Sequence, residues 1–280
     1  MGLANDLTEV RHLIRQGWEG VATEYARDRS GIFERCGSRL LELLRPSPGS
    51  KLFDVGCGTG VVALLASAWV GPEGQVAGSD VAMAMVKLAR QAAADQGSRD
   101  IALCQMDAEQ LGLPTASFDS VTCAFSLFQF PDMERALAEM WRVLKPGGRL
   151  ALSNWGPGYF SPIASMQRDL FREFGLRPLL TNPIAFKAEQ LRALLRETDF
   201  AAVELIEETE GVWFENPEAV WAFNLDMGPF PMMLQGQLSV EQQGELERRF
   251  TMMLQELMTD QGIACKFHLL YALAEKGGSG

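Results

Sequence analysis

Short apolar runs alternate with helical stretches through the middle of the chain. Runs of the right length for strands occupy residues 51–55, 75–79, 101–105, 119–124 and 148–154. Between them, apolar residues recur at helical spacing over residues 60–70, 82–95 and 132–144. Gly147 and Gly148 end the last of these helices directly before a strand. This alternation predicts a parallel sheet with helices on both of its faces.

The two ends of the chain show different patterns. Residues 6–45 are predicted to be helical, because their apolar residues recur at helical spacing. In the last third, a predicted helix near 187–197 leads into a strand near 200–208, and a further strand is expected near 264–274. A stretch rich in Met, Phe and Trp lies between these two strands. One helix face is predicted within that stretch, made of Leu246, Phe250, Met253, Leu254 and Leu257.

Composition narrows the class of protein. The 280 residues can form one large domain, or one domain with a lid. Lys and Arg total 25 against 36 Asp and Glu, which gives a net charge of −11. Because a nucleic-acid binder needs cations to neutralise phosphates, this balance argues against such a partner.

Three features bear on location. No apolar run approaches the roughly 20 residues of a membrane span, and the first residues are too acidic for a secretory signal. The five cysteines are scattered and odd in number, without CxxC spacing, which favours reduced thiols over disulfides or a zinc site. We therefore expect a soluble cytoplasmic protein without a bound metal. Residues 277–280 are expected to form a flexible tail.

A glycine-rich turn follows the first predicted strand. Gly56, Gly58 and Gly60 have G-x-G-x-G spacing, and a helix is predicted to begin directly after them. Glycine permits positive φ and a close approach of a ligand to the backbone, and the helix N-terminus favours an anionic group. The nicotinamide-cofactor pattern is G-x-G-x-x-G, but residue 61 is Val61. A tight turn without a ligand is the alternative interpretation.

Acidic residues follow the strands in the same way. Asp54 lies in the first strand, Asp80 closes the second and Asp107 follows the third. An acid at the end of the second strand can accept both hydroxyls of a ribose. Taken singly, each acid is also typical of a helix cap or a turn. Ligands of open α/β sheets bind along the carboxyl edge, so the three acids together favour a ligand site.

Five segments together resemble the class I S-adenosylmethionine-dependent methyltransferases. They are FDVGCGTG (53–60), GSD (78–80), MDAEQLGLP (106–114), SFDSVTCAFSLFQFPD (117–132) and WRVLKPGGRLALSNW (141–155). The resemblance covers roughly residues 45–155 and is greatest to the branch that includes the ubiquinone/menaquinone-biosynthesis and other small-molecule methyltransferases. It implies an α/β Rossmann-like fold, with a seven-stranded sheet whose last two strands form an antiparallel pair. The two late strands predicted here agree with that ending.

The resemblance also implies roles for particular residues. Asp54 and Gly56 would lie along the methionine moiety, Asp80 would bind the ribose hydroxyls, and Asp107 would accept a hydrogen bond from the adenine amine. The full set implied for S-adenosylmethionine is Trp18, Tyr25, Asp54, Gly56, Cys57, Gly58, Gly60, Asp80, Val81, Asp107, Ala108 and Phe125. Trp18 and Tyr25 resemble the N-terminal segment that covers the cofactor, although an ordinary amphipathic helix has the same pattern.

The acceptor pocket is expected from segments outside the common core. The predicted organisation is a helical cap at 1–45, a cofactor-binding core at 46–155 and the remaining core at 156–276, with lid insertions at 156–185 and 210–262. Aromatic and Met side chains in these insertions suit a small, apolar or aromatic acceptor. The residues predicted to line the pocket are Ser126, Gln129, Phe130, Trp155, Tyr159, Trp213, Trp221, Met227 and Phe230. The same side chains would equally form the internal core of a lid, and the Met-rich part would suit a homodimer contact.

The reaction itself is left partly open. His268, near the start of the last strand, is a candidate general base, with a purely structural histidine as the alternative. Methyl transfer to oxygen, carbon or nitrogen fits equally, with S-adenosylhomocysteine as the product. A non-catalytic protein that binds S-adenosylmethionine is the second hypothesis. An NAD-dependent oxidoreductase is the third, and Val61 and the paired final strands argue against it.

Overall fold

One seven-stranded sheet organises the computed structural model, which describes residues 7–27, 30–98, 101–177, 182–226, 234 and 236–277. The strand order is β3-β2-β1-β4-β5-β7-β6. The strands are β1 (Lys51–Val55), β2 (Gln75–Asp80), β3 (Ile101–Gln105), β4 (Phe118–Ala124), β5 (Leu144–Trp155), β6 (Phe200–Phe214) and β7 (Ile263–Lys276). The five strands predicted for the middle of the chain are all present, within a few residues of their expected bounds.

The sheet is parallel up to β5 and antiparallel beyond it. Strands β1 to β5 pair in parallel with their neighbours, whereas β7 runs antiparallel to both β5 and β6. This confirms the predicted fold class, including the antiparallel ending. The strand order reverses between β1 and β4, and ligands of open α/β sheets bind where such a reversal opens a crevice.

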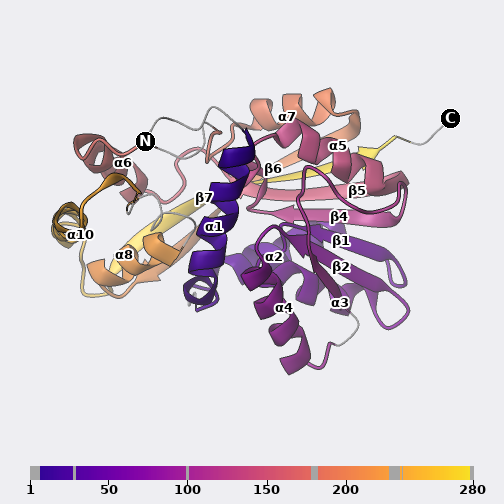
Figure 1. The fold of residues 1–280 in the computed structure, drawn as a ribbon, viewed down its shortest axis with the longest axis horizontal. Helices are drawn as coiled ribbons and strands as arrows, with labels where there is room; N and C mark the ends of the chain where they lie inside the picture. The colour runs from indigo at the N-terminus through magenta and orange to yellow at the C-terminus, as the bar shows by residue number, and fades with distance from the viewer. Residues whose placement is uncertain are drawn as a thin grey trace.

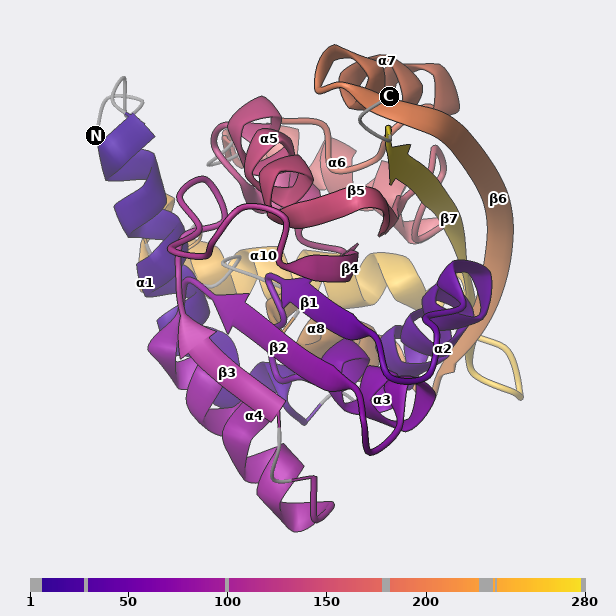
Figure 2. The ribbon, with the colours of Figure 1, turned by 90° about the vertical axis from the view of Figure 1, so that its right-hand side faces the viewer.

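Helices cover both faces of the sheet. Helices α2 (Ile32–Leu44), α3 (Val61–Val70) and α4 (Met83–Asp95) lie on one face, and α5 (Met133–Val143) and α7 (Ala188–Glu197) lie on the other (Figure 2). Helix α1 (Leu7–Tyr25) packs on neither face. It crosses the edge of the sheet at which β2 and β3 end (Figure 2). The predicted helical region at 6–45 is therefore two helices with different roles.

Strands β6 and β7 extend well beyond the rest of the sheet. Their pairing continues to Phe214 and Ile263, so the first residues of the predicted insertion at 210–262 belong to a strand. Helices α6 (Ile163–Glu173), α8 (Pro217–Asp226) and α10 (Val240–Gln255) gather around this extension, at the left of Figure 1. The predicted helix face is confirmed in part: Leu246, Phe250 and Leu254 are buried in α10, Met253 is half-buried, and Leu257 lies beyond the end of the helix.

An aromatic cluster forms the core of this extension. The ring of Phe267 lies 5.2 Å from Phe160, 5.7 Å from Phe223 and 5.4 Å from Trp155, measured between centroids. Phe214 joins the cluster 5.1 Å from Phe223. Many aromatic residues of the two insertions thus pack on one another, as expected for the core of a lid. Across the described ranges, no helix is both long and apolar enough to cross a membrane.

Truncation of the central ring should destabilise the fold. We expect Phe267→Ala to lower the free energy of unfolding by about 3–5 kcal/mol, because it leaves a cavity among three rings. Trp213 is 55% exposed on the neighbouring strand, so Trp213→Ala should change stability by no more than about 0.5 kcal/mol. Urea denaturation of both variants measures the difference, and equal losses would contradict this account of the core.

Candidate functional site

A cavity lies at the carboxyl ends of β1, β2 and β4, and α1 forms its outer wall. Most lining residues come from α1, from the glycine loop after β1 and from the turns after β2, β3 and β4, and a few come from α2, α3 and α4. The structure thereby brings together segments that are far apart in the sequence. The predicted residues on the cavity wall are Trp18, Tyr25, Asp54, Gly56, Cys57, Gly58, Asp80, Val81, Asp107, Ala108, Phe125, Ser126, Gln129 and Phe130.

The glycine loop turns sharply against the start of the segment after β4. Gly56 has φ 66°, and a Cβ at this position would lie 2.6 Å from both Cβ and Oγ of Ser126. The Ser126 hydroxyl donates to the Gly56 carbonyl at 3.0 Å. Gly56 is therefore required both for its backbone conformation and for this close approach. Gly60 instead faces α4, where an added Cβ would lie 3.0 Å from Ala89 Cβ, and it does not line the cavity.

Asp80 joins the glycine loop to the start of α4. Its carboxylate accepts the Gly58 N–H at 2.9 Å on one oxygen and the Ala82 N–H at 2.9 Å on the other. Burial raises the pKa of Asp80, although both backbone hydrogen bonds act in the opposite direction. Each carboxylate oxygen keeps a further lone pair, so Asp80 can still accept hydrogen bonds from the hydroxyl groups of a ligand.

Asp54 is the most deeply buried acid of the cavity. Its side chain is 1% exposed and accepts a hydrogen bond from the Thr122 hydroxyl at 2.7 Å. Burial is the main reason that the pKa of Asp54 rises to about 7, and the charge of Asp80 raises it further. Two acids that share a cavity without a nearby cation disfavour each other's ionisation. A positively charged ligand group would relieve that conflict.

The third acid, Asp107, lies at the rim. Its side chain is 42% exposed, and it accepts the Glu109 N–H at 2.9 Å. The guanidinium of Arg11, from α1, lies 3.9 Å from its other oxygen. Among the residues that line the cavity, Asp54, Asp80, Asp107 and Glu109 are acidic and Arg11 alone is basic. The polar side of the cavity therefore carries excess negative charge.

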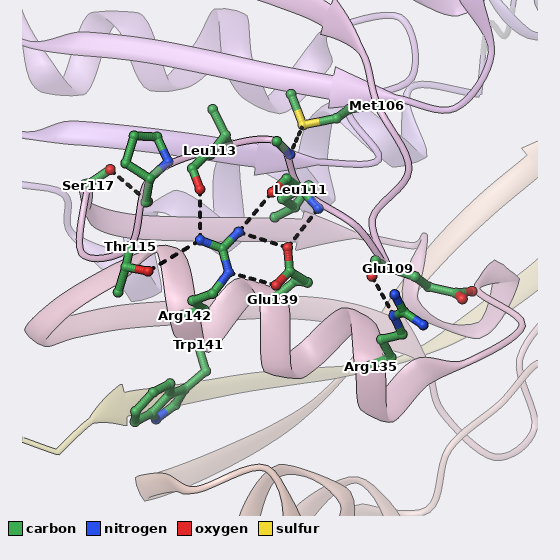
Figure 3. A network of polar contacts seen from close by, with 12 residues as sticks. Met106, Glu109, Leu111, Leu113, Thr115, Ser117, Arg135, Glu139, Trp141 and Arg142 are labelled. Atoms are coloured by element: carbon green, nitrogen blue, oxygen red, sulfur yellow. Dashed lines mark hydrogen bonds and ion pairs between the residues drawn. The ribbon is translucent and has the colours of Figure 1, made fainter.

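Helix α5 fixes the loop that carries Asp107 and Glu109 (Figure 3). Arg142 donates to the Leu111 carbonyl at 2.8 Å and to the Leu113 carbonyl at 2.7 Å. Glu139 accepts the Leu111 N–H at 2.7 Å and also pairs with Arg142. Arg135 donates to the Glu109 carbonyl at 2.8 Å. These three side chains, on one face of α5, satisfy backbone groups that the loop itself leaves without partners.

Aromatic rings form the apolar part of the cavity wall. Tyr25 from α1, Phe33 from α2 and Phe125 after β4 lie in sequence, with 5.5 Å between the centroids of successive rings. Phe125 has φ 51°, which is unusual for a residue with a side chain, and its N–H donates to the Ser153 carbonyl at 2.8 Å. Its ring packs against that of Trp155, with 4.2 Å between centroids and 32° between the ring planes. A strained residue held in this way is typical of a functional site.

Several predicted acceptor residues lie elsewhere. Trp155 packs against Phe125, and Tyr159 packs against Trp155. Trp221 packs on Phe250, with 5.3 Å between ring centroids, and Trp213 is exposed to solvent. None of these four lines the cavity. Met227 and Phe230 fall outside the described residues. The candidate base His268 is not among the lining residues either, and its Nδ1 lies 3.1 Å from the Thr209 hydroxyl.

The cavity also includes residues that the sequence analysis did not predict to lie in a site. These are Arg11, Ile14, Phe33, Thr59, Val61, Val62, Met85, Met106, Glu109, Ala124 and Pro131. Arg11, Ile14, Trp18 and Tyr25 follow one face of α1, so helical spacing from the two predicted aromatic residues would have found the other two. Nothing in the sequence indicates that Arg11 pairs with Glu109, because 98 positions separate them.

The comparison with known proteins agrees with this geometry. Residues 53–152 match the family model described as a methyltransferase domain. This segment is a methyltransferase domain. The match confirms the resemblance predicted from the motifs between residues 53 and 155. It covers the glycine loop, Asp80, the Asp107 loop and most of β5, but not α1 or the β6–β7 extension.

Curated relatives match about half of the chain. Aklanonic acid methyltransferase DauC of Streptomyces sp. (strain C5) is 36% identical over 141 residues, which cover 50% of this chain and 64% of that protein. Demethylmenaquinone methyltransferase of Listeria monocytogenes is 39% identical over 142 residues, covering 49% of this chain and 60% of that protein. The chain thus spans less than two thirds of the length of either relative.

A solved structure extends the likeness of fold beyond the methyltransferase domain. The YcgJ protein of Bacillus subtilis superposes with a TM-score of 0.62, covering 88% of this chain and 100% of that chain at 19% sequence identity. At this identity the likeness concerns the fold alone. It supports the Rossmann-like architecture described above.

Gly56 offers a direct test of the loop geometry. We expect Gly56→Ala to destabilise the protein by about 1–3 kcal/mol and to weaken ligand binding, because the new Cβ meets Ser126 in a left-handed conformation. Gly244 lies inside α10 with nothing within 4 Å of an added Cβ, so Gly244→Ala should be neutral or stabilising. Thermal unfolding of the two variants compares them, and a neutral Gly56→Ala would refute the close approach.

The raised pKa of Asp54 predicts a pH dependence of stability. Its pKa is about 7 in the folded state and near 3.8 when unperturbed, so between these values the folded state binds the extra proton. This contribution to the free energy of unfolding is complete below about pH 4 and is lost as the pH rises to about 7. We expect Asp54→Asn to remove that decline. Urea denaturation from pH 4 to pH 8 checks it, and parallel profiles for both proteins would contradict the assignment.

Proposed function

We propose that this protein binds S-adenosylmethionine in the cavity and transfers its methyl group to a small acceptor, releasing S-adenosylhomocysteine. The observation that carries the proposal is the convergence of the glycine loop and three acids on one cavity within a methyltransferase domain. A turn without a ligand would explain the glycines alone. It would not explain why buried acids from successive strand ends face the same space.

The residues fit the chemical groups of this cofactor. Asp80 is oriented by two backbone amides and retains acceptor capacity for the hydroxyls of a ribose. Asp54 faces the glycine loop and would stabilise a nearby cationic group. Asp107 and the backbone beside Ala108 lie at the other end of the wall, where they can take hydrogen bonds from a nucleobase. Four acids against one Arg among the lining residues suit a ligand with positive charge.

When bound, S-adenosylmethionine supplies an electrophilic methyl group on a sulfonium that leaves as a neutral thioether. What remains for the chain is to hold an acceptor in line and to exclude water. The rings of Tyr25, Phe33 and Phe125 are placed for the second task, because they follow one another along the cavity lining as an apolar surface. Phe125 is fixed from behind by Trp155.

The same wall supports a small, largely apolar or aromatic acceptor. Its rings come from α1, α2 and the end of β4, rather than from the insertions at 156–185 and 210–262. Two relatives bear the names of the acceptors aklanonic acid and demethylmenaquinone, which supports the choice of a small organic molecule. The placement of His268 outside the cavity wall gives no support to its role as a base. We therefore favour an acceptor that is already ionised when it binds.

Three further expectations belong to this proposal. The described cysteines are all free, in keeping with the predicted cytoplasmic location. Met252 is an apolar residue whose side chain is 59% exposed, and a homodimer contact would cover such side chains. Analytical ultracentrifugation measures whether the protein is a monomer or a homodimer. A non-catalytic cofactor-binding protein would bind the same ligand but transfer no methyl group to any small aromatic acceptor.

Calorimetric titration with S-adenosylmethionine, S-adenosylhomocysteine and NAD tests the proposal. We expect micromolar binding of both adenosyl ligands and none of NAD. Asp80→Ala should weaken S-adenosylhomocysteine binding by about 1–3 kcal/mol, the scale of a lost hydrogen bond to a charged group. Asp169, in α6, is 70% exposed and does not line the cavity, so Asp169→Ala is the matched control and should bind normally. Binding of NAD alone, or of no ligand, would refute the proposed function.

A further inference from the structure

Helix α1 is a wall of the cavity that lies outside the main hydrophobic core. Arg11, Ile14, Trp18 and Tyr25 line the cavity from one face of the helix. Its apolar attachment to α4 is a small cluster separate from the main core, centred on Ala22, Ala82 and Met85. Segments with few buried apolar contacts open more easily than the core of a protein. Polar contacts are therefore important in keeping α1 closed over the cavity.

Two acidic side chains make those polar contacts. Glu19, in the middle of α1, accepts the backbone N–H groups of Met83 and Ala84 at 2.6 and 2.9 Å, at the first turn of α4. Near the other end of α1, Arg11 donates through Nε to Glu109 at 2.8 Å, with a second contact through its terminal nitrogen. The Glu19 contact is exposed to solvent. The Arg11 contact is not, because the side chain of Glu109 is only 3% exposed.

Glu109 is held in place from the body of the protein. Its other carboxylate oxygen accepts a hydrogen bond from the Asp132 N–H at 3.0 Å, and its backbone carbonyl accepts one from the Arg135 side chain of α5. Within the described part of the chain, Arg11 is the one side chain that pairs with this buried carboxylate. Opening of α1 would thus leave a buried charge without its partner, which is costly. The pair lies beside Asp107, at the end of the cavity proposed to hold the nucleobase.

We propose that Arg11 and Glu109 form a latch that positions α1 over the nucleobase end of the cavity and thereby sets how long an adenosyl ligand stays bound. The inference rests on the proposed function, because it assumes that the cavity takes such a ligand. Glu109 is a positioning residue that acts through Arg11 and α1. Breaking the pair favours the open arrangement, so the ligand escapes faster, while its entry is not slowed.

Stopped-flow fluorescence of Trp18 and the other tryptophans measures the two rates with S-adenosylhomocysteine. We expect Arg11→Gln to raise the dissociation rate constant about tenfold and to change the association rate constant less than twofold, as is usual when one partner of a buried pair is removed. Arg11→Lys should restore part of the loss. The double variant Arg11→Gln with Glu109→Gln should dissociate no faster than the worse single variant, because the pair acts as a unit.

Arg15→Gln is the matched control. Arg15 is an exposed residue of the same helix, four residues further on, and is not part of the cavity wall. The Arg15→Gln variant removes the same charge as Arg11→Gln and should leave the association and dissociation rate constants unchanged. If Glu109→Gln does not fold, the two Arg11 variants carry the test alone, since Arg11 is 28% exposed. Thermal unfolding establishes that each variant is folded.

The outcomes separate the two proposals. If the unmodified protein does not bind S-adenosylhomocysteine, the proposed function fails. If it binds, but Arg11→Gln dissociates at the normal rate or no faster than Arg15→Gln, the latch fails and the function stands. Equal changes in both rate constants would also overturn the latch, since they would indicate a general distortion of the cavity.

Discussion

The carboxylate of Asp80 is the interaction on which the site depends. It ends β2, accepts one backbone amide from the glycine loop after β1 and accepts another from the start of α4. Three segments of different elements are thereby fixed around one side chain. Because the strand order reverses beside β1, the glycine loop faces the turn after β4 across an open crevice. The two amides orient the carboxylate and leave it able to accept further hydrogen bonds.

The rest of the cavity divides into two walls of opposite character. Asp54, Asp80 and Asp107 gather on the side of β1 to β3, and burial keeps the first two from ionising freely. Aromatic rings from α1, α2 and the end of β4 form the apolar surface of the same cavity. A ligand with a cationic part and a sugar suits the first wall, and the proposed apolar acceptor suits the second.

Much of the fold could be predicted from the sequence. Strands and helices up to residue 155 follow from local apolar periodicity, and the glycines and acids mark the loops between them. The antiparallel ending came from the resemblance and is confirmed by β7. The prediction was less complete where contacts are non-local. The 15 residues of β6 pair with β7 to their end, and the aromatic residues around them pack together instead of lining the cavity.

The sequence by itself determined the backbone of the cofactor half, because each motif there acts within a few residues of its own position. Gly56 needs a positive φ, and Asp80 bonds the amide two residues ahead. Only the tertiary structure decided which further side chains join the predicted ones in the cavity. Phe33 enters it from α2, Arg11 reaches Glu109 across 98 positions, and α5 holds the Asp107 loop through Arg142. These contacts depend on how helices cross the sheet edge, and short-range patterns carry no information about that crossing.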